Sequence, residues 1–234
     1  MVERGLAETR EKAQAMIMAG NVLVDDQPAT KAGTAVAENA SIRLKEPPQP
    51  YVSRGGLKLQ GAVQDFRLNV LEKICLDVGS STGGFTQFLL LKGAARVYAL
   101  DVDVNQLDWK IRNDPKVKTI EMNARFLEPS HIPEFVDLVT IDASFISLTM
   151  LIPRIPPMLK PEGMCLALVK PQFEVGRENV GKGGIVRDEK LQRDAIERVA
   201  AAGRAAGLEF VASKESAITG REGNREFFVL FRKP

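Results

Sequence analysis

Short apolar runs alternate with amphipathic stretches along most of the chain. Strand-length apolar runs lie at 74–78, 96–101, 117–120, 137–141 and 164–170, and helical patterns lie at 83–92, 104–112, 148–158 and 188–206. Such alternation is typical of βα units, whose parallel strands are joined by helices. Two last runs, GLEFVASKESAI and EFFVLFRK, are separated only by the polar turn TGREGN, so they are expected to pair antiparallel. The pattern predicts an α/β fold with a mostly parallel sheet that ends in an antiparallel hairpin.

The first 45 residues follow a different pattern. Residues 10–20 form a short helical stretch that begins after Thr9, a residue favoured at helix N-caps, and ends at a glycine. Strand-like runs follow within 22–30 and 41–45, around polar turns. One helix and a few short strands indicate a small α+β module.

The segment KEPPQPY at 45–51 separates the two patterns. Its three prolines break any helix or central strand and favour an extended spacer. We therefore predict a small module at 1–46, a proline-rich linker at 47–53 and a larger domain at 54–234.

The composition is that of an ordinary globular protein. Of the 234 residues, 44% are hydrophobic and 26% are charged, which is enough for one good-sized core and a small second module. The net charge of +2 neither demands nor excludes a nucleic-acid partner. No apolar run approaches the ~18 residues of a membrane span, and the charged start MVERGLAETREK does not resemble a secretory signal. We expect a cytoplasmic protein with no membrane partner.

The cysteines and the histidine do not indicate a reactive or metal-binding site. Cys75 and Cys165 each lie within an apolar run, where a free cysteine behaves as a small hydrophobe, so neither a metal nor a disulfide is expected. The single histidine, His131, lies between prolines in EPSHIPEF and is interpreted as a surface loop residue.

The stretch DVGSSTGGFT at 77–86 follows the first strand of the predicted sheet and is the candidate ligand loop. In open α/β sheets, ligands bind at the carboxyl ends of the strands, where the strand order reverses. The glycines are spaced G-x-x-x-G-G, which fits a dinucleotide fingerprint poorly and argues against an NAD-linked oxidoreductase. Asp101 ends the next strand, where a carboxylate can accept hydrogen bonds from a ribose diol. S-adenosylmethionine, an adenosine ligand without phosphates, suits these features.

The predicted cofactor-binding residues come from this loop and from the ends of neighbouring strands. They are Asp77, Gly79, Ser80, Gly83, Gly84, Phe85, Asp101, Asn123 and Asp142. Asn123, in the segment MNAR, is expected near the adenine. The alternative is a purely structural glycine turn, with Asp101 as a solvated strand end.

Two charged residues end neighbouring strands at the same edge of the predicted sheet. VDLVTIDASFISL ends its strand at Asp142, and MCLALVKPQF ends its strand at Lys170. Burying either charge alone is costly, so the two are expected to pair in the cleft. Glu226 opens a strand expected beside that of Lys170, and Lys58 is predicted to be exposed on its helix or to face a cleft. Taken singly, Lys58 and Glu226 would be interpreted as surface residues.

The motifs of the chain resemble, in their order, those of one known family. They are SRGGLKL, LDVGSSTGGFT, TIDASFIS, LVKPQFEVGRE, VGKGGIVRD and NREFF, and the family is the TlyA (hemolysin A) family of FtsJ-like ribosomal RNA methyltransferases. The segment GLAETREKAQAMIMAGNVLVDDQPATKAGTAV resembles that family's N-terminal RNA-binding module, of the type found in ribosomal protein S-four. The resemblance covers nearly the whole chain. The module is expected to be short at its N-terminus, because the family's module normally begins with several more residues.

This resemblance implies a Rossmann-like, S-adenosylmethionine-dependent methyltransferase fold with a seven-stranded sheet whose last strand is antiparallel. It also implies a Lys-Asp-Lys-Glu tetrad for ribose 2′-O-methylation, which maps onto Lys58, Asp142, Lys170 and Glu226. The implied substrate is cytidine ribose in 16S and/or 23S ribosomal RNA, with ribosomal subunits as partners. Lys170 is expected to act either as the general base or as a cation that stabilises the developing alkoxide.

Phosphate contacts are expected from the glycine-rich loop 171–187 and from the start of the first helix. The residues are Arg177, Lys182, Arg187, Arg10 and Lys12. The alternatives are an ordinary flexible connection and a solvated helix face.

Two other functions stay open at the level of the sequence. The first is a non-catalytic RNA-binding protein that retains a methyltransferase-like domain. The second is a hemolysin-type toxin, although no strongly amphipathic or membrane-spanning segment favours it.

Overall fold

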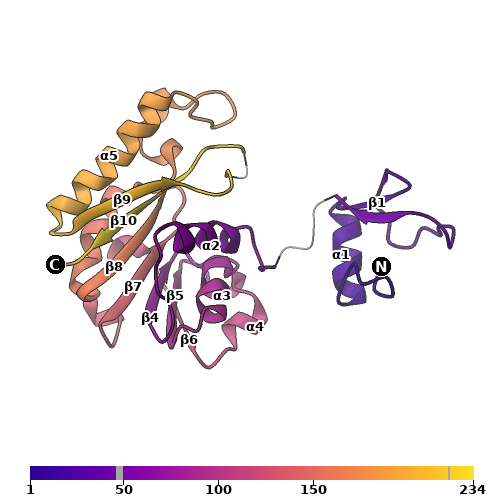
Figure 1. Cartoon of the computed structure of the whole chain (residues 1–234), viewed down its shortest axis with the longest axis horizontal. Helices are drawn as coiled ribbons and strands as arrows, with labels where there is room; N and C mark the ends of the chain where they lie inside the picture. Colours follow the sequence, from indigo (N-terminus) through magenta and orange to yellow (C-terminus); the bar gives the residue numbers. More distant parts are fainter. Residues whose placement is uncertain (46–49, 221) are drawn as a thin grey trace. The chain divides into compact units, whose positions relative to one another are not determined.

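The computed structural model describes residues 1–45, 50–220 and 222–234 and divides the chain into two compact units (Figure 1). The first unit is Met1–Pro50 and the second is Tyr51–Pro234. Part of the predicted linker, at 47–49, and one residue of the predicted TGREGN turn lie outside the described residues.

The first unit contains one helix and a three-stranded antiparallel sheet. Helix α1, Arg10–Met18, begins after Thr9, whose side chain accepts a hydrogen bond from the Lys12 amide at 3.2 Å. The sheet has β1 at its centre; its strands are β1, Val22–Val24, β2, Gln27–Ala29, and β3, Ile42–Leu44. The tight β1–β2 turn is made by two aspartates with φ values of 47° and 65°, as two-residue hairpins require.

The second unit is built on a seven-stranded sheet in the order β6-β5-β4-β7-β8-β10-β9. Its strands are β4, Ile74–Val78, β5, Arg96–Asp101, β6, Val117–Glu121, β7, Val136–Ile141, β8, Leu159–Val169, β9, Glu209–Glu215, and β10, Phe227–Arg232. The pairs from β6 to β8 are parallel, whereas β10 is antiparallel to both of its neighbours. This arrangement confirms the predicted fold class. The strand order reverses beside β4, which marks the expected ligand site.

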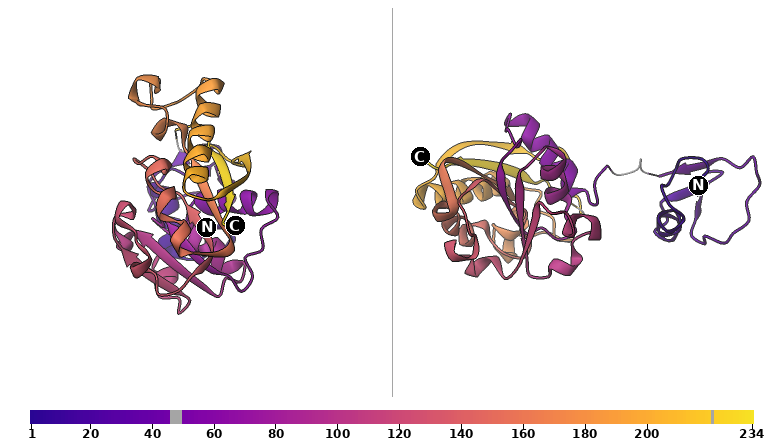
Figure 2. Two further views of the ribbon diagram at one scale, coloured as in Figure 1. Left: turned by 90° about the vertical axis from the view of Figure 1, so that its left-hand side faces the viewer. Right: turned by 90° about the horizontal axis from the view of Figure 1, so that it is seen from below.

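Helices cover both faces of the sheet and bury a core on each side (Figure 2). Helices α2, Gly55–Asp65, and α3, Gly84–Leu91, pack residues such as Phe88 against one face. Helix α5, Glu189–Ala205, packs Val199 and its neighbours against the other face. No helix in the described ranges is both long enough and apolar enough to cross a bilayer.

The predicted helix at 148–158 is wrong, because this segment forms three consecutive 3-10 turns. They are η4, Leu148–Met150, η5, Ile152–Arg154, and η6, Pro156–Met158. Prolines at 153, 156 and 157 lack the backbone N–H that a continuous α-helix needs. The apolar side chains still reach the core, since Leu148, Ile152 and Met158 are buried.

The predicted helix at 104–112 is divided into two shorter elements. They are η1, Val104–Gln106, and α4, Trp109–Arg112. Asp103 accepts from the Asn105 amide and Asp108 accepts from the Lys110 amide, so each aspartate starts its own turn. The remaining 3-10 turns are η2, Ala124–Phe126, η3, Pro129–His131, η7, Pro171–Phe173, and η8, Arg177–Asn179.

Candidate active site

A cavity of about 660 Å³ lies at the carboxyl ends of the central parallel strands. It is lined by residues that end or follow β4, β5, β6 and β7. Four of the predicted cofactor-binding residues line it, namely Gly79, Asp101, Asn123 and Asp142. The sheet therefore brings together the strand ends that the sequence analysis connected.

Gly79 allows the tip of β4 to approach the tip of β7. Its φ is +85°, and a Cβ atom at this position would lie 2.6 Å from the carbonyl oxygen of Asp142. A side chain cannot be accommodated against a backbone atom at that distance. The amides of Gly79 and Ser80 both donate to the carbonyl oxygen of Leu100, at 2.8 and 3.0 Å, which fixes the loop against β5.

Asp101 is held in place by two backbone amides at the end of β5. Its Oδ2 accepts from the Ser81 amide at 2.9 Å, and its Oδ1 accepts from the Asp103 amide at 3.2 Å. A carboxylate oxygen has further lone pairs, so the ribose diol of an adenosine ligand fits this position. Asn123 uses its Oδ1 to accept from the Arg125 amide at 3.0 Å, which leaves its NH₂ group for an adenine.

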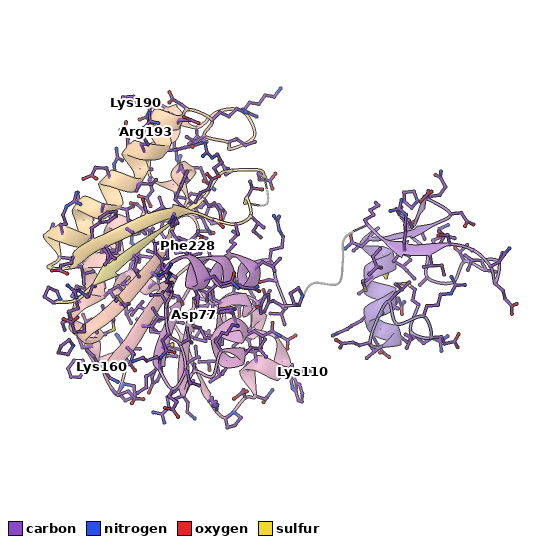
Figure 3. All side chains as sticks on the ribbon, in the orientation of Figure 1. Asp77, Lys110, Lys160, Lys190, Arg193 and Phe228 are labelled. Carbon is purple, nitrogen blue, oxygen red and sulfur yellow. The ribbon has the colours of Figure 1, made fainter. Side chains whose placement is uncertain are left out.

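Asp77 lies inside the protein and does not line the cavity (Figure 3). It is 0% exposed, and its two carboxylate oxygens accept from the hydroxyls of Thr86, at 2.7 Å, and Thr140, at 3.0 Å. Burial raises the pKa of Asp77 to about 7, and the two hydroxyl hydrogen bonds act in the opposite direction. The side chain connects β4 to α3 and β7.

The rest of the predicted glycine loop also packs against protein. A Cβ atom on Gly83 would lie 2.8 Å from Leu107 and Ile111, and one on Gly84 would lie 2.9 Å from the Gly56 amide. Phe85 is buried and stacks on Phe228. Ser80 is 4% exposed, and its hydroxyl has no hydrogen-bond partner within residues 1–45, 50–220 and 222–234. These residues do not line the cavity. They determine how closely α2 and α4 approach the loop after β4, and so affect the shape of the cavity indirectly.

The predicted Asp142–Lys170 ion pair is present at the rim of the cavity. Lys170 Nζ lies 2.6 Å from Asp142 Oδ1 and donates a hydrogen bond to the Ser144 hydroxyl at 2.9 Å. The contact with Asp142 is an ion pair by distance, but its angles do not make it a directed hydrogen bond. Both side chains are largely buried, at 10% exposure for Lys170 and 19% for Asp142.

Lys58 and Glu226 form a second ion pair beside the first. Lys58 Nζ lies 2.5 Å from Glu226 Oε2, and the side chains are 11% and 3% exposed. Glu226 directly precedes β10, where Phe227 is opposite Val169, so the register places it next to Lys170. Lys58, predicted to be exposed or to face a cleft, is largely buried against this carboxylate. The four residues of the implied tetrad thus gather at one edge of the sheet.

The loops that follow β7 and β8 support each other through several side chains. Glu174, 3% exposed, accepts from the Ser147 hydroxyl at 2.5 Å and from the Leu148 amide at 2.8 Å. Burial raises the pKa of Glu174, which these hydrogen bonds oppose. The rings of Phe145 and Phe173 lie 5.3 Å apart between their centroids. These contacts, like the ion pair of Lys170 with Asp142, join the loop after β7 to the loop after β8. Each loop therefore helps to hold the other in position.

Several cavity and loop residues were not predicted from the sequence. They are Ser81, Val102, Gln106, Met122, Arg125, Ser144, Phe145 and Glu174. The segment DASFIS offered one signal, an aromatic residue among small polar residues shortly after an apolar run. In the structure Phe145 is 92% exposed and has a φ of +64°, which is uncommon for a bulky residue. Within the ranges that the structure describes, no group of three or more potential metal ligands is found.

Comparisons with known proteins agree with this geometry. An FtsJ-like methyltransferase model matches residues 51–233, and an S4 domain model matches residues 1–42. Bacillus subtilis YqxC is 46% identical over 239 residues, which cover 100% of this chain and 84% of YqxC. The Mycobacterium tuberculosis 16S/23S rRNA (cytidine-2′-O)-methyltransferase TlyA is 43% identical over 234 residues, which cover 99% of this chain and 87% of TlyA.

A solved structure supports the same relationship. A Streptococcus thermophilus protein named as a hemolysin is 40% identical to this chain, and its structure superposes with a TM-score of 0.79. The match covers 99% of this chain and 85% of that chain. The chain therefore belongs to the TlyA family of FtsJ-like methyltransferases and carries an S4 domain at its N-terminus.

Proposed function

We propose that this protein transfers a methyl group from S-adenosylmethionine to the 2′-oxygen of a cytidine ribose in ribosomal RNA. The name of the Mycobacterium tuberculosis relative supports the reaction and the substrate, and the S4 match at 1–42 supports an RNA partner. Ribosomal subunits are the proposed partners, and the cytoplasm is the proposed location.

Residues of the cavity suit the proposed cofactor. Asp101 would hold its ribose hydroxyls, Asn123 its adenine, and the backbone at Gly79 would allow its close approach. The cofactor supplies an electrophilic methyl group. The same cavity reaches Asp142, which brings the cofactor site to the Lys170 pair.

Lys170 is the proposed group that acts on the ribose 2′-hydroxyl. A lysine ammonium has three N–H donors; here one donates to the Ser144 hydroxyl, and Asp142 is the counter-ion. A remaining N–H would orient the 2′-oxygen and stabilise the negative charge that develops as the hydroxyl proton passes to water and the oxygen takes the methyl group, with S-adenosylhomocysteine as the leaving group. We assign Lys170 this electrostatic role, and Asp142 and Ser144 the role of fixing its position. The ion pair of Lys58 with Glu226 is a second pair of opposite charges next to Lys170.

The Asp142–Lys170 ion pair at the rim of the cavity is the observation that carries this proposal. The test is incubation of the protein with labelled S-adenosylmethionine and separate 30S and 50S subunits that lack the modification, followed by mass mapping of the methylated nucleotide. We expect label at a cytidine ribose with the wild type and none with Lys170→Ala. Lys190→Ala is a matched control, because Lys190 also pairs with an aspartate but lies exposed on α5 (Figure 3).

Two results would contradict the proposal. Binding of S-adenosylmethionine and RNA without methyl transfer would indicate a non-catalytic RNA-binding protein. If Lys170→Ala transferred the methyl group as fast as Lys190→Ala, the tetrad would have no part in the mechanism.

A further inference from the structure

A second cavity, of about 560 Å³, lies beside the proposed cofactor site. It is formed between the loop after β7 and the loop after β8, and the segment 145–147 lines both cavities. The two cavities therefore lie on either side of one short segment, which also carries the contacts to Glu174. None of the tetrad residues lines the second cavity.

The side chains of this cavity carry three kinds of chemistry that the proposed methyl transfer does not use. Phe173 presents an aromatic ring, and Gln172 has a buried amide oxygen, Oε1, that has no hydrogen-bond partner among the residues that the structure describes. Arg177 is exposed and has no ion-pair partner within the described ranges. Proteins recognise an unstacked nucleotide with groups of these three kinds: a ring that stacks on its base, a polar group that hydrogen-bonds to its base edge and a cation that contacts its phosphate.

Buried side chains hold part of the backbone around this cavity in place. Asn224, 3% exposed, accepts from the Val186 amide at 3.0 Å and donates to the Gly184 carbonyl at 2.8 Å. Gln192 of α5 donates to the Val186 carbonyl at 2.8 Å. Gly176 and Gly184 line the cavity with φ values of +83° and +75°, so no side chains narrow it at these points. These contacts attach the far end of the 171–187 loop to the body of the domain.

We propose that this second cavity binds a nucleotide next to the methylated one in the same RNA strand. The inference rests on the proposed function, because it needs a ribose at Lys170. Lys170 directly precedes the loop that forms the cavity, and Phe145 lines both sites. A strand with its target ribose at Lys170 can therefore place a neighbouring base against Phe173 and a phosphate against Arg177.

The test separates RNA recognition from cofactor binding and from chemistry. Methyl transfer to unmodified subunits is measured with Arg177→Ala and Gln172→Glu, and the affinity for S-adenosylhomocysteine is measured in parallel. We expect Arg177→Ala to raise the KM for the subunit about tenfold, with kcat within about twofold and unchanged S-adenosylhomocysteine affinity. Gln172→Glu keeps the size of the side chain but adds a charge that repels phosphate, so its KM should rise at least as much.

Arg154→Ala is the control, since Arg154 is exposed on η5 and lines neither cavity. The inference would be overturned if Arg177→Ala and Gln172→Glu had the same KM for the subunit as Arg154→Ala. It would also be overturned if these two variants lost affinity for S-adenosylhomocysteine by the same factor by which their KM for the subunit rose. Thermal unfolding of each variant shows whether a change comes from misfolding, and the two substitutions test the cavity independently. A wild type that methylates neither subunit would refute the proposed function and this inference together, whereas an active wild type with unaffected variants would refute only the inference.

Discussion

Asp77 and Asp142 lie at the carboxyl ends of adjacent parallel strands, yet their surroundings differ completely. Asp77 is within β4, is 0% exposed, and binds two threonine hydroxyls. Asp142 comes one residue after β7, lines the cavity and pairs with Lys170. In the sequence, both residues end an apolar run and both were predicted to bind the cofactor.

The difference shows that the partners of a strand-end carboxylate decide its role. Inside the strand, neutral hydroxyls satisfy Asp77, and its burial favours the uncharged form. Beyond the strand, Asp142 forms an ion pair with Lys170 at the rim of the cavity. We therefore expect one aspartate to govern stability and the other to govern methyl transfer.

Asp142→Asn should produce the largest effect, on activity. The amide keeps the size of the side chain but removes the counter-ion of Lys170, so kcat should fall about 10²- to 10³-fold. Asp137→Asn is a matched control, because Asp137 lies near the start of β7, the strand that leads to Asp142, is 18% exposed and pairs with Lys160 at the opposite end of that strand. Single-turnover methylation of subunits measures the effect. Equal methylation rates for Asp142→Asn and Asp137→Asn would show that Asp142 does not govern methyl transfer.

Asp77→Ala should instead act on stability. It leaves two buried threonine hydroxyls without their acceptor and opens a small void, which together cost about 3 kcal/mol of the free energy of unfolding. Denaturant unfolding measures this loss, and methylation at low temperature shows whether the folded fraction keeps its kcat. A stable variant with no activity would mean that Asp77 has a direct role in the reaction.

Asp77→Asn should change how stability depends on pH. In the folded state the pKa of Asp77 is raised to about 7, whereas an unfolded aspartate ionises near pH ~4. Between these values the folded protein binds the extra proton, so this contribution to stability is present at low pH and is lost as the pH rises to about 7. Relative to the wild type, Asp77→Asn should gain about 3 kcal/mol between pH ~4 and ~7. A constant difference in the free energy of unfolding over this range would contradict the raised pKa.

Thr140→Val should give the smallest effect. Valine matches the shape of threonine but cannot donate to Asp77 Oδ1, and one such hydrogen bond contributes about 1 kcal/mol. Thr86→Val removes the donor to the other oxygen and is the companion variant. Because both hydroxyls serve one carboxylate, the double variant should deviate from additivity in denaturant unfolding.

The sheet could be predicted from the sequence because each strand is a separate apolar run. The hairpin of β9 and β10 followed from the absence of a helix between its strands. The segment 148–158 was mispredicted because its apolar spacing suits a helix, and tertiary packing buries the same residues in 3-10 turns that its prolines permit.

The site was accessible from the sequence only in part. The pair of Asp142 and Lys170 could be predicted, because each residue follows an apolar strand and the carboxyl ends of parallel strands lie at the same edge of a sheet. The pair of Lys58 and Glu226 was not predictable from local pattern, because 168 residues separate them, and only the family resemblance associated them. Glycine spacing was also ambiguous: Gly79 lines the cavity, whereas Gly83 and Gly84 allow contacts between helices and loops.

The contact of Lys58 with Glu226 joins helix α2 to a residue 168 positions later in the chain. During synthesis, the lysine therefore stays without its carboxylate until every strand from β4 to β9 has been made. A nascent chain can contain the complete parallel part of the sheet and still lack this charge pair. The order of the residues along the chain thus delays assembly of the centre until Glu226 has been added, directly before β10.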